Sequence, residues 1–382
     1  MMRIVNEICC GLDVHAKTVV ACLLSRTKKE VRTFSTMTDD LLALLDWLSA
    51  EECPQVAIES TGIYWKPVFK ILEGSLTVIL VNARHIKAVP GRKTDVKDCE
   101  WLADLLRHGL LKPSFIPPLE IRELRELTRY RQSLKGELTR IANRVNKEIE
   151  SGNIKLRQVA SDALGVSGRK MLKLLAAGET DVELMAEQAH NKLREKIPEL
   201  RRALQGKLTP AQRWVLTELL VRYEELEAAI MRVDRRIDQE LAAHPQIKES
   251  VDRIDNLPGI GPQNAVDVIS EIGTDMKAFP TGHHLASWAA VCPGNNESAG
   301  KRYSGKTGKG NPYLRTALVQ AAWAATKAKS TYLSAQYHHL VKRLGKKKSL
   351  IAVAHSMLVI IYQMLSKNEQ YLDLGANYFD TL

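Results

Sequence analysis

Four acidic residues in the first hundred positions have the type and placement needed to bind a divalent cation. Asp13 and Glu59 each end a short apolar segment. Asp95 and Asp98 are three residues apart, a spacing that places both on one face of a helix. Carboxylates that converge repel one another unless a cation lies between them, and their oxygens suit Mg²⁺. Such ions can stabilise the attacking and leaving oxygens of phosphodiester transfer.

Each of these acids also has a simpler interpretation. An acidic residue at the end of a strand is often a helix cap or a turn former, and for Asp13 alone that is the better interpretation. Glu100 and Asp104 lie on the same predicted helix as Asp98 and could equally supply a ligand. The fourth position of the acidic set therefore stays open.

The segment Leu257-Pro258-Gly259-Ile260-Gly261 lies between two predicted helices. Gly259 and Gly261 would let the backbone approach a ligand closely, and the free amides at the next helix start would point at an anion. This pattern resembles a helix-hairpin-helix element, which grips DNA phosphates without regard to sequence. An ordinary tight helical turn is the alternative, and the basic charge of the chain favours DNA contact.

Ser298 lies among small and basic residues and is followed by Lys301 and Arg302. A serine hydroxyl is a weak nucleophile unless a neighbouring group activates it, although here it could meet a phosphate. From spacing alone, a flexible Ser/Gly loop without chemistry is the better interpretation of this segment.

Positive charge is concentrated near the carboxyl end of the chain. The net charge is +11 and the pI about 9.3, which favours polyanionic partners. No Asp or Glu occurs between Ser298 and Asn368, a segment whose 13 cations exceed the net charge of the whole chain. Such a one-sided block indicates a nucleic-acid-binding surface. Its cations are Lys301, Arg302, Lys306, Lys309, Arg315, Lys327, Lys329, Lys342, Arg343, Lys346, Lys347, Lys348 and Lys367.

Cysteine and apolar content bound the cellular context. The six cysteines include no C-x-x-C pair, and we expect neither a disulfide framework nor a zinc site. We expect no apolar run long enough for a transmembrane helix and no signal-peptide core, and therefore a reducing cytoplasm.

Hydrophobic periodicity predicts an α/β region followed by helices. In residues 1–117 the predicted order β-β-β-α-β-α-β-α indicates a mixed sheet flanked by helices. Residues 118–249 form a coiled-coil region with an insert at 151–210, and residues 250–382 form a C-terminal helical domain. The predicted strands are 7–13, 17–25, 30–35, 55–59 and 76–82, and the helices between them are 39–50, 65–72 and 95–108.

Two heptad seams, at 118–150 and 214–241, predict long helices that could form an antiparallel hairpin or mediate dimerisation. Arg131 interrupts the first seam. In the last domain, a Gly-rich basic loop at 294–311 precedes helices predicted at 312–328, 331–344 and 350–365.

Taken in order, the motifs resemble a family. Gly11-Leu12-Asp13-Val14-His15, Ile58-Glu59-Ser60-Thr61-Gly62 and Lys93-Thr94-Asp95-Val96-Lys97-Asp98 resemble the DEDD signature of the bacterial insertion-sequence transposase family numbered one hundred and ten, including its eleven-eleven subgroup. Leu257–Gly261 and Gly310-Asn311-Pro312-Tyr313-Leu314-Arg315 fit the family's C-terminal domain. The resemblance implies an RNase H-like, RuvC-like first domain.

The resemblance also implies a mechanism. Asp13, Glu59, Asp95 and Asp98 would bind Mg²⁺, with Mn²⁺ as the alternative, and Ser298 would form a phosphoserine intermediate with DNA. Donor and target double-stranded DNA would be chosen by a noncoding guide RNA, and a homo-oligomer, a dimer or a tetramer on DNA, would act in the bacterial cytoplasm at the nucleoid. Ala299 departs from the family pattern, in which glycine follows the serine.

Two other functions remain open at this point. A Holliday-junction-type endonuclease would use the carboxylates and water without Ser298. A non-catalytic nucleic-acid-binding protein would need neither, and the ordered acidic set argues against it.

Overall fold

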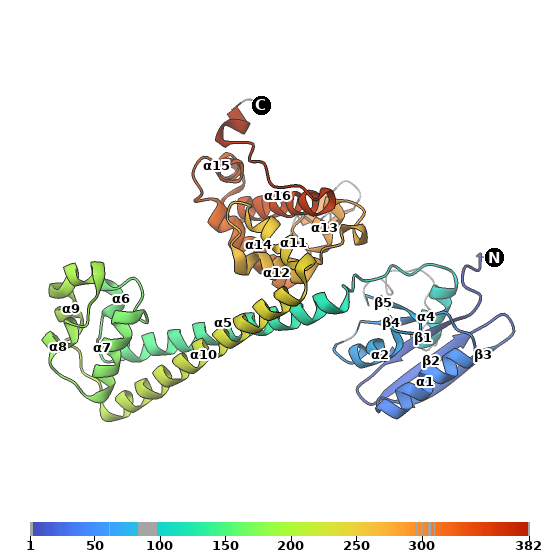
Figure 1. Ribbon diagram of the computed structural model, residues 1–382, viewed down its shortest axis with the longest axis horizontal. Coiled ribbons are helices and arrows are strands. Elements are labelled where there is room, and N and C mark those ends of the chain that lie inside the picture. Colours follow the sequence, from blue (N-terminus) through green and yellow to red (C-terminus); the bar gives the residue numbers. More distant parts are fainter. Residues whose placement is uncertain are drawn as a thin grey trace. The chain divides into compact units, whose positions relative to one another are not determined.

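The structure, a computed structural model, describes residues 3–60, 62–82, 98–294, 296–298, 301–304, 307–308 and 310–380. The chain divides into two compact units, Met1–Ile116 and Pro117–Leu382, which are coloured blue to cyan and green to red in Figure 1. We refer to them as the N-terminal and C-terminal units. The predicted division of the second unit at residue 250 stays a prediction.

The N-terminal unit is built on a mixed five-stranded sheet, as the apolar periodicity predicted. The strand order is β3-β2-β1-β4-β5, in which β1, β2 and β3 are antiparallel neighbours and β4 and β5 run parallel to β1. This arrangement fits the RuvC-like α/β domain that the sequence led us to expect. The strands are β1 (Cys9–Val14), β2 (Thr18–Leu24), β3 (Lys29–Ser35), β4 (Gln55–Glu59) and β5 (Thr77–Val81).

Helices cover both faces of this sheet. On one face, α1 (Thr38–Ala50) and α2 (Trp65–Leu72) bury an apolar layer that includes Leu12 and Val56. On the other face, α4 (Asp98–Arg107) packs over Ala57 and its neighbours. Side chains point alternately to the two faces of a sheet. Because helices cover both faces here, the central strands are apolar on both faces, and their sequences are nearly continuous hydrophobic runs.

Two long helices, α5 (Leu119–Ser151) and α10 (Pro210–Ala243), form an antiparallel hairpin (Figure 1). The direction follows from contacts at both ends, since Arg131 pairs with Asp234 while Gln212 bonds to Ser151. The hairpin confirms one of the two arrangements that the heptads allowed.

Arg131, which interrupts the predicted seam, is 2% exposed and joins three helices. Its guanidinium lies 2.9 Å from Asp234 on α10 and 2.8 Å from Asp267 on α12 (Pro262–Ile272). A buried arginine is tolerated when its charge is paired in this way. The apparent defect in the heptad pattern is therefore the attachment point of α12.

The insert lies at the end of the hairpin where α5 ends and α10 begins (Figure 1). The chain enters and leaves it through backbones in close contact: a Cβ on Gly206 would lie 2.2 Å from the carbonyl oxygen of Gly152. The amide of Lys207 also donates to that carbonyl, at 3.0 Å. The insert consists of α6 (Leu156–Val159), α7 (Val166–Ala177), α8 (Val182–Ala186), η1 (Asn191–Lys196) and α9 (Ile197–Ala203).

The remaining helices form a bundle at the other end of the hairpin, where α5 begins and α10 ends. In the predicted basic loop, the structure has a short hairpin of β6 and β7, which corrects the expectation of an irregular loop. The bundle also contains α13, a helix that the periodicity did not predict. The elements are α11 (Pro245–Asp255), α12, η2 (Met276–Ala278), α13 (Gly282–Trp288), β6 (Asn296–Ser298), β7 (Lys301–Ser304), α14 (Pro312–Ala325), α15 (Tyr332–Leu344), α16 (Lys346–Lys367) and η3 (Ala376–Asp380).

Helix α16 corrects the expectation that no segment could span a membrane. It has the length and the composition of a span, with a mean hydropathy of 1.7 over its most apolar window. In this fold, 44% of that window is buried, and the helix packs against α13, α14 and α15. Its apolar face thus forms the centre of the bundle.

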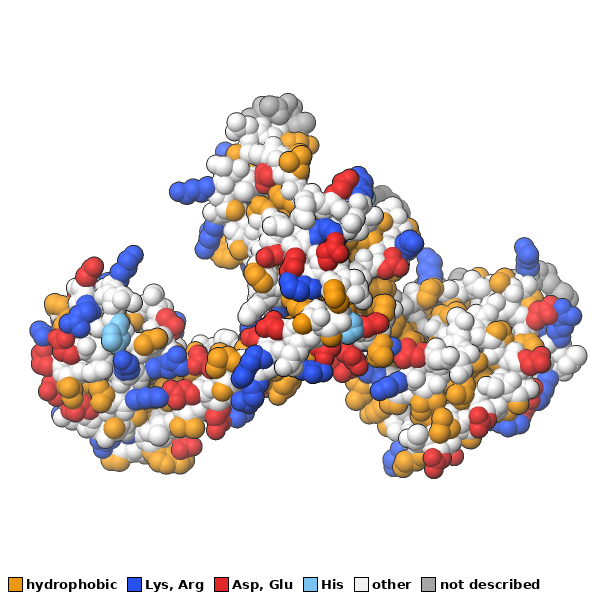
Figure 2. Space-filling model, in the orientation of Figure 1, with side chains coloured by type: hydrophobic (Ala, Val, Ile, Leu, Met, Phe, Trp, Pro, Cys, Tyr) orange, Lys and Arg blue, Asp and Glu red, His pale blue; other side chains and the backbone are white. Residues whose placement is uncertain are grey.

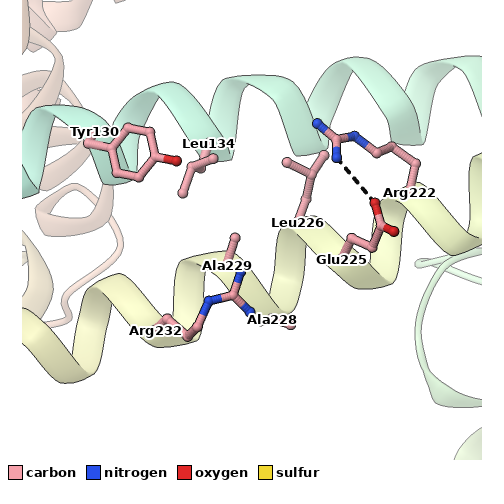
Figure 3. A pocket seen from close by; sticks show the side chains of 8 residues that line it. All are labelled: Tyr130, Leu134, Arg222, Glu225, Leu226, Ala228, Ala229 and Arg232. Atoms are coloured by element: carbon pink, nitrogen blue, oxygen red, sulfur yellow. Dashed lines mark hydrogen bonds and ion pairs between the residues drawn. The ribbon is translucent and has the colours of Figure 1, made fainter.

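The surface of the hairpin carries both signs of charge. In Figure 2, basic and acidic side chains are interspersed over the hairpin and its insert. Several are paired, as Lys173 is with Glu224 at 2.6 Å. Midway along the hairpin, the small side chain of Ala229 leaves a groove of about 490 Å³ between Tyr130 and Leu226 (Figure 3).

Candidate functional site

Asp13 and Glu59 leave adjacent parallel strands on the same face of the sheet. Strand β1 pairs with β4 so that Leu12 is opposite Ile58, and the next residue on each strand is an acid. Side chains alternate along strands, which puts Asp13 on the face of Gly11 and Glu59 on the face of Ala57. Both acids are partly buried. The predicted convergence of these two carboxylates agrees with the register.

Gly11 brings α4 onto this face. A Cβ at Gly11 would lie 2.2 Å from the carbonyl oxygen of Cys99 and 2.5 Å from the amide nitrogen of Ala103. Any side chain there would force the helix away, since both atoms belong to its backbone. The first turn of α4, which begins at Asp98, is thereby held beside the end of β1.

The carboxyl group of Asp13 responds to the charges of the other two acids. The pKa of Asp13 is raised above its usual range, mainly by burial and further by the negative charges of Asp98 and Glu59. His15 opposes this rise, with its Nε2 atom 3.2 Å from Asp13 Oδ2. Asp13 therefore ionises in the neighbourhood of two other acids and one exposed imidazole.

The chemistry of this donor set suits a hard divalent cation. Mg²⁺ prefers carboxylate oxygens and retains part of its water shell. Within the described ranges, no group of three or more His, Cys, Asp or Glu side chains is arranged closely enough to hold a metal ion. Asp95, the remaining predicted ligand, lies outside the described residues. Asp13, Glu59 and Asp98 thus supply a shared negative field rather than a closed coordination shell.

The two alternative acids on α4 are engaged elsewhere. Glu100 Oε2 lies 2.7 Å from Lys29 Nζ on β3, and Asp104 Oδ1 lies 3.5 Å from His108 Nδ1. Asp98 is the acid of this helix whose charge acts on the Asp13 carboxyl group. The structure therefore favours Asp98 over Glu100 and Asp104 as the contribution of α4.

Ser298 is the last residue of β6 and pairs with Lys301 on β7. Of the other predicted phosphate contacts, Arg302 lies on β7, while Lys306 and Lys309 fall outside the described residues. Arg315, in the first turn of α14, donates from Nη1 to Thr307 Oγ1 at 2.7 Å. Ser298 therefore lies on a short antiparallel strand pair, and α14 begins at Pro312, 14 residues later in the chain.

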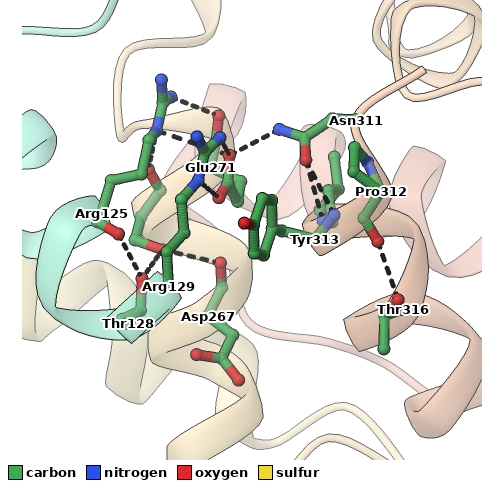
Figure 4. Close-up of polar contacts among 11 residues, drawn as sticks. Arg125, Thr128, Arg129, Asp267, Glu271, Asn311, Pro312, Tyr313 and Thr316 are labelled. Atoms are coloured by element: carbon green, nitrogen blue, oxygen red, sulfur yellow. Dashed lines mark hydrogen bonds and ion pairs between the residues drawn. The ribbon is translucent and has the colours of Figure 1, made fainter. Parts of the chain in front are cut away.

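A buried acid fixes the start of α14, as Figure 4 shows. Glu271 on α12 is 2% exposed and accepts two hydrogen bonds from Arg129, at 2.7 and 2.8 Å. Arg125 Nε lies 3.4 Å from Glu271, and Asn311 donates to the same carboxylate. The Arg129 guanidinium also lies 4.5 Å from the ring centroid of Tyr313. We call Arg125, Arg129, Glu271 and Asn311 the Glu271 cluster.

Asn311 joins the Glu271 cluster to helix α14. Its Oδ1 accepts hydrogen bonds from the amides of Tyr313 and Leu314, so it caps the helix. The Glu271 cluster was not predicted from the sequence, although Asn311 before Pro312 is a recognisable signal of a helix start. Nothing local in the sequence indicates that Glu271 would meet the two arginines.

The glycines of the turn between α11 and α12 differ in their surroundings. Gly259 has φ +91°, and a Cβ there would lie 2.3 Å from the carbonyl oxygen of Ala321 on α14. Packing against α14 therefore accounts for this glycine without any ligand. A Cβ on Gly261 would meet no atom within 4 Å. The predicted phosphate contact of this turn stays a prediction.

Two family models match this chain, one in its N-terminal part and one in its C-terminal part. A family model described as "Transposase" matches residues 10–151, and one described as "Transposase IS116/IS110/IS902 family" matches residues 251–338. The transposase for insertion sequence element IS1111A of Coxiella burnetii is 30% identical over 176 residues. That match covers 43% of this chain and 45% of the relative, so it spans less than half of that protein.

A second relative matches over a longer range. The insertion element IS110 uncharacterized 43.6 kDa protein of Streptomyces coelicolor is 26% identical over 318 residues, 76% of this chain and 75% of that protein. Among solved structures, T. thermophilus RuvC in complex with a Holliday junction substrate covers 28% of this chain and 100% of its own, with 12% identity and a TM-score of 0.22. From both family models and these relatives, the chain belongs to the IS110 family of transposases, which includes the IS1111 subgroup.

Proposed function

We propose that this chain is the transposase of an insertion sequence, which cleaves and rejoins double-stranded DNA with a divalent metal ion. One observation carries the proposal: Gly11 lets α4 approach β1, and the charges of Asp98 and Glu59 both act on the carboxyl group of Asp13. A protein that only bound nucleic acid would gain nothing from gathering carboxylates, because they repel phosphates.

The acidic residues would hold Mg²⁺, with Mn²⁺ as the alternative, and Asp95 would complete the set. When bound, the ion would offset the negative charge that develops on phosphodiester oxygens. Asp13 is the central member, since its pKa responds to both neighbours. Burial and the neighbouring acids raise its pKa, and a bound cation would oppose that rise by stabilising the ionised carboxylate.

Ser298 is proposed to carry the covalent step. Its Oγ would form a bond to a DNA phosphorus while the bond from that phosphorus to the leaving strand breaks, and the leaving oxygen takes a proton to become a hydroxyl. Attack by a different strand end on the phosphoserine would restore the Ser298 hydroxyl and join the DNA. Lys301, Arg302, Lys306, Lys309 and Arg315 would bind the surrounding phosphates.

Oligomer formation and RNA guidance complete the proposal. The family resemblance supports a homo-oligomer in which the acidic site and the serine come from different subunits. It also supports selection of donor and target DNA by a noncoding RNA of the element. Location in the cytoplasm, at the nucleoid, follows from the same proposal.

The deciding experiment compares Ser298→Ala with Asp13→Ala in a recombination assay on element DNA, with the element RNA and Mg²⁺ supplied. We expect wild-type protein to form a covalent protein–DNA adduct at Ser298, and both variants to lose adduct and product. Ser304→Ala, on the other strand of the same short hairpin, is the matched control and should retain both.

Two outcomes would redirect the assignment. DNA cutting that persists in Ser298→Ala and is lost in Asp13→Ala would identify a Holliday-junction-type endonuclease that uses water. Wild-type recombination by Asp13→Ala would remove the catalytic role of the acidic set.

A further inference from the structure

The end of the chain turns back onto α15. After α16, no residue from Asn368 to Phe379 is buried, and the segment ends in η3, which packs against α15. We call residues 368–380 the tail. Leu372 and Leu374 within it are 81% and 55% exposed. The tail thus lies on the bundle without contributing to its core.

Two aromatic rings of the tail, those of Tyr378 and Phe379, contact α15, and Phe379 makes the near-parallel contacts. The ring of Phe379 stacks on Tyr332, with centroids 5.4 Å apart and planes at 18°, and on His339, at 5.2 Å and 21°. Tyr332 and His339 are seven residues apart, so they share one face of the helix two turns apart. That separation accommodates one flat ring with a stacking partner on each side.

Near-parallel stacking on two sides is unusual for a side chain. Aromatic pairs in proteins favour edge-to-face or offset arrangements, as Tyr332 and Tyr378 show with planes at 88°. A flat ring held between aromatic side chains is instead the way in which proteins hold unpaired nucleobases. Phe379 occupies a position that suits a base.

The charges around this face suit a nucleic-acid strand. Residues 298–368 contain no acid, and Lys342, Arg343 and Lys346 on α15 and α16 are exposed. In the part of the chain that the structure describes, none of these three makes an ion pair. Such cations attract phosphates, and this attraction weakens as the salt concentration rises.

The tail supplies acids to this acid-free part of the fold. Asp373 accepts the backbone amide of Tyr332 at 2.9 Å and the hydroxyl of Tyr371 at 3.0 Å. It also accepts the amide of Gly375 at 2.7 Å. The tail therefore presents a carboxylate and a flat ring to α15, as a nucleotide presents a phosphate and a base.

We propose that the face of α15 formed by Tyr332 and His339 is a stacking site for an unpaired DNA base, and that the tail occupies it by imitating a nucleotide. The choice of DNA rests on the proposed function, in which strands separate when they are cut and exchanged. Release of the tail opens the site, so binding of single-stranded DNA and docking of the tail exclude each other.

The experiment measures equilibrium binding of full-length protein to a fluorescent single-stranded DNA oligonucleotide by anisotropy, without Mg²⁺. We expect Phe379→Ala to bind the strand at least about fivefold more tightly than wild type, the lower end of what stacking of one base contributes. Adding His339→Ala to that variant should remove the gain. Leu372→Ala, at a position of the same tail that is 81% exposed, is the matched control and should bind as wild type does.

Asp373→Asn provides a second route to the same result, because it weakens the tail without removing any aromatic ring. It should also tighten binding, and circular dichroism should show that each variant keeps its helices. Unchanged or weaker binding in both Phe379→Ala and Asp373→Asn would overturn the proposal, as would an equal gain on duplex DNA. A gain seen with RNA of the same sequence but absent with DNA would overturn the choice of DNA.

This assay involves no cleavage and is independent of Ser298. Failure of the recombination mechanism would leave its result unchanged. Conversely, a tail that does not compete with DNA would leave the acidic site and the serine as proposed.

Discussion

Two acidic sites in this molecule are built in opposite ways. Glu271 is 2% exposed, and its carboxylate meets two arginines and an asparagine. Asp13 is 25% exposed, and its charged neighbours are two further acids and one exposed histidine. A buried charge with a full set of donors stabilises a fold only through that pairing. A charge left among like charges marks a place where a cation can be used.

The electrostatic response of each site follows from its neighbours. Burial lowers the pKa of Arg125 to about 10, and the carboxylate of Glu271 opposes this change. At the other site, burial and like charge together raise the pKa of Asp13. At the first site arginines offset the buried charge, whereas at the second site two neighbouring acids add to the cost of ionising Asp13. Stability and function should therefore respond oppositely to mutation at the two sites.

The largest expected effect is at Glu271. Glu271→Ala leaves Arg125 and Arg129 without their buried partner, and we expect the free energy of unfolding to fall by about 3–5 kcal/mol. Denaturant unfolding of the full chain measures this. Glu100→Ala is the matched control, since it breaks an ion pair with the exposed Lys29 and should cost at most about 1 kcal/mol. Equal losses in the two variants would show that the Glu271 cluster is not a special structural site.

Gly11→Ala should have the next largest effect. The added Cβ cannot fit against the backbone of α4, so the helix must shift at a cost of about 1–3 kcal/mol. Recombination should fall more than stability does, because Asp98 moves with the helix. Gly74→Ala, where a Cβ would meet nothing within 4 Å, is the control and should be close to wild type in both assays. Full activity in Gly11→Ala would separate the approach of α4 from function.

The smallest expected effect is the change in stability of Asp13→Asn, and its sign tests the comparison most directly. Asp13 has a raised pKa in the fold, so its ionised form costs stability at neutral pH, and Asp13→Asn should be more stable by roughly 0.5 kcal/mol. The gain should shrink as the pH falls through the raised pKa, since the native carboxyl group is then protonated. Thermal unfolding at several pH values measures both trends. Mg²⁺ should raise the melting temperature of the wild type and leave Asp13→Asn unchanged.

A destabilised Asp13→Asn protein would reverse the comparison. It would mean that the pair with His15 contributes more than the repulsion from Asp98 and Glu59. The acidic site would then resemble the Glu271 cluster, with its charge satisfied internally.

The acidic site was easier to predict from the sequence than the Glu271 cluster. Asp13 and Glu59 could be predicted because buried strands are short apolar runs whose ends are easy to locate, and Gln55–Glu59 was predicted to the residue. The α4 contribution was harder, because periodicity does not distinguish Asp98 from Glu100 or Asp104. The ion pairs of Glu100 and Asp104 and the effect of Asp98 on Asp13 favour Asp98, which stays a prediction.

Contacts between distant segments leave no local signal. Arg125 and Arg129 meet Glu271 across more than 140 residues of sequence. Arg131 interrupts the heptad pattern, and the sequence does not show why, because one of its partners, Asp267, lies on a helix outside the hairpin. The β6–β7 pair was missed because the segment 294–311 is rich in glycine, asparagine and lysine, which are depleted in strands.

The crossing of backbones at Gly152 and Gly206 has an evolutionary consequence. Because the chain departs from and rejoins the long helices at a single point, the small subdomain between them resembles a module on a stalk. The stalk is about 50 Å long, from the 33 residues of α5 at 1.5 Å each. Lengthening, trimming or exchanging that module need not disturb the opposite end of the stalk, so related elements are free to diversify there while their chemistry stays fixed.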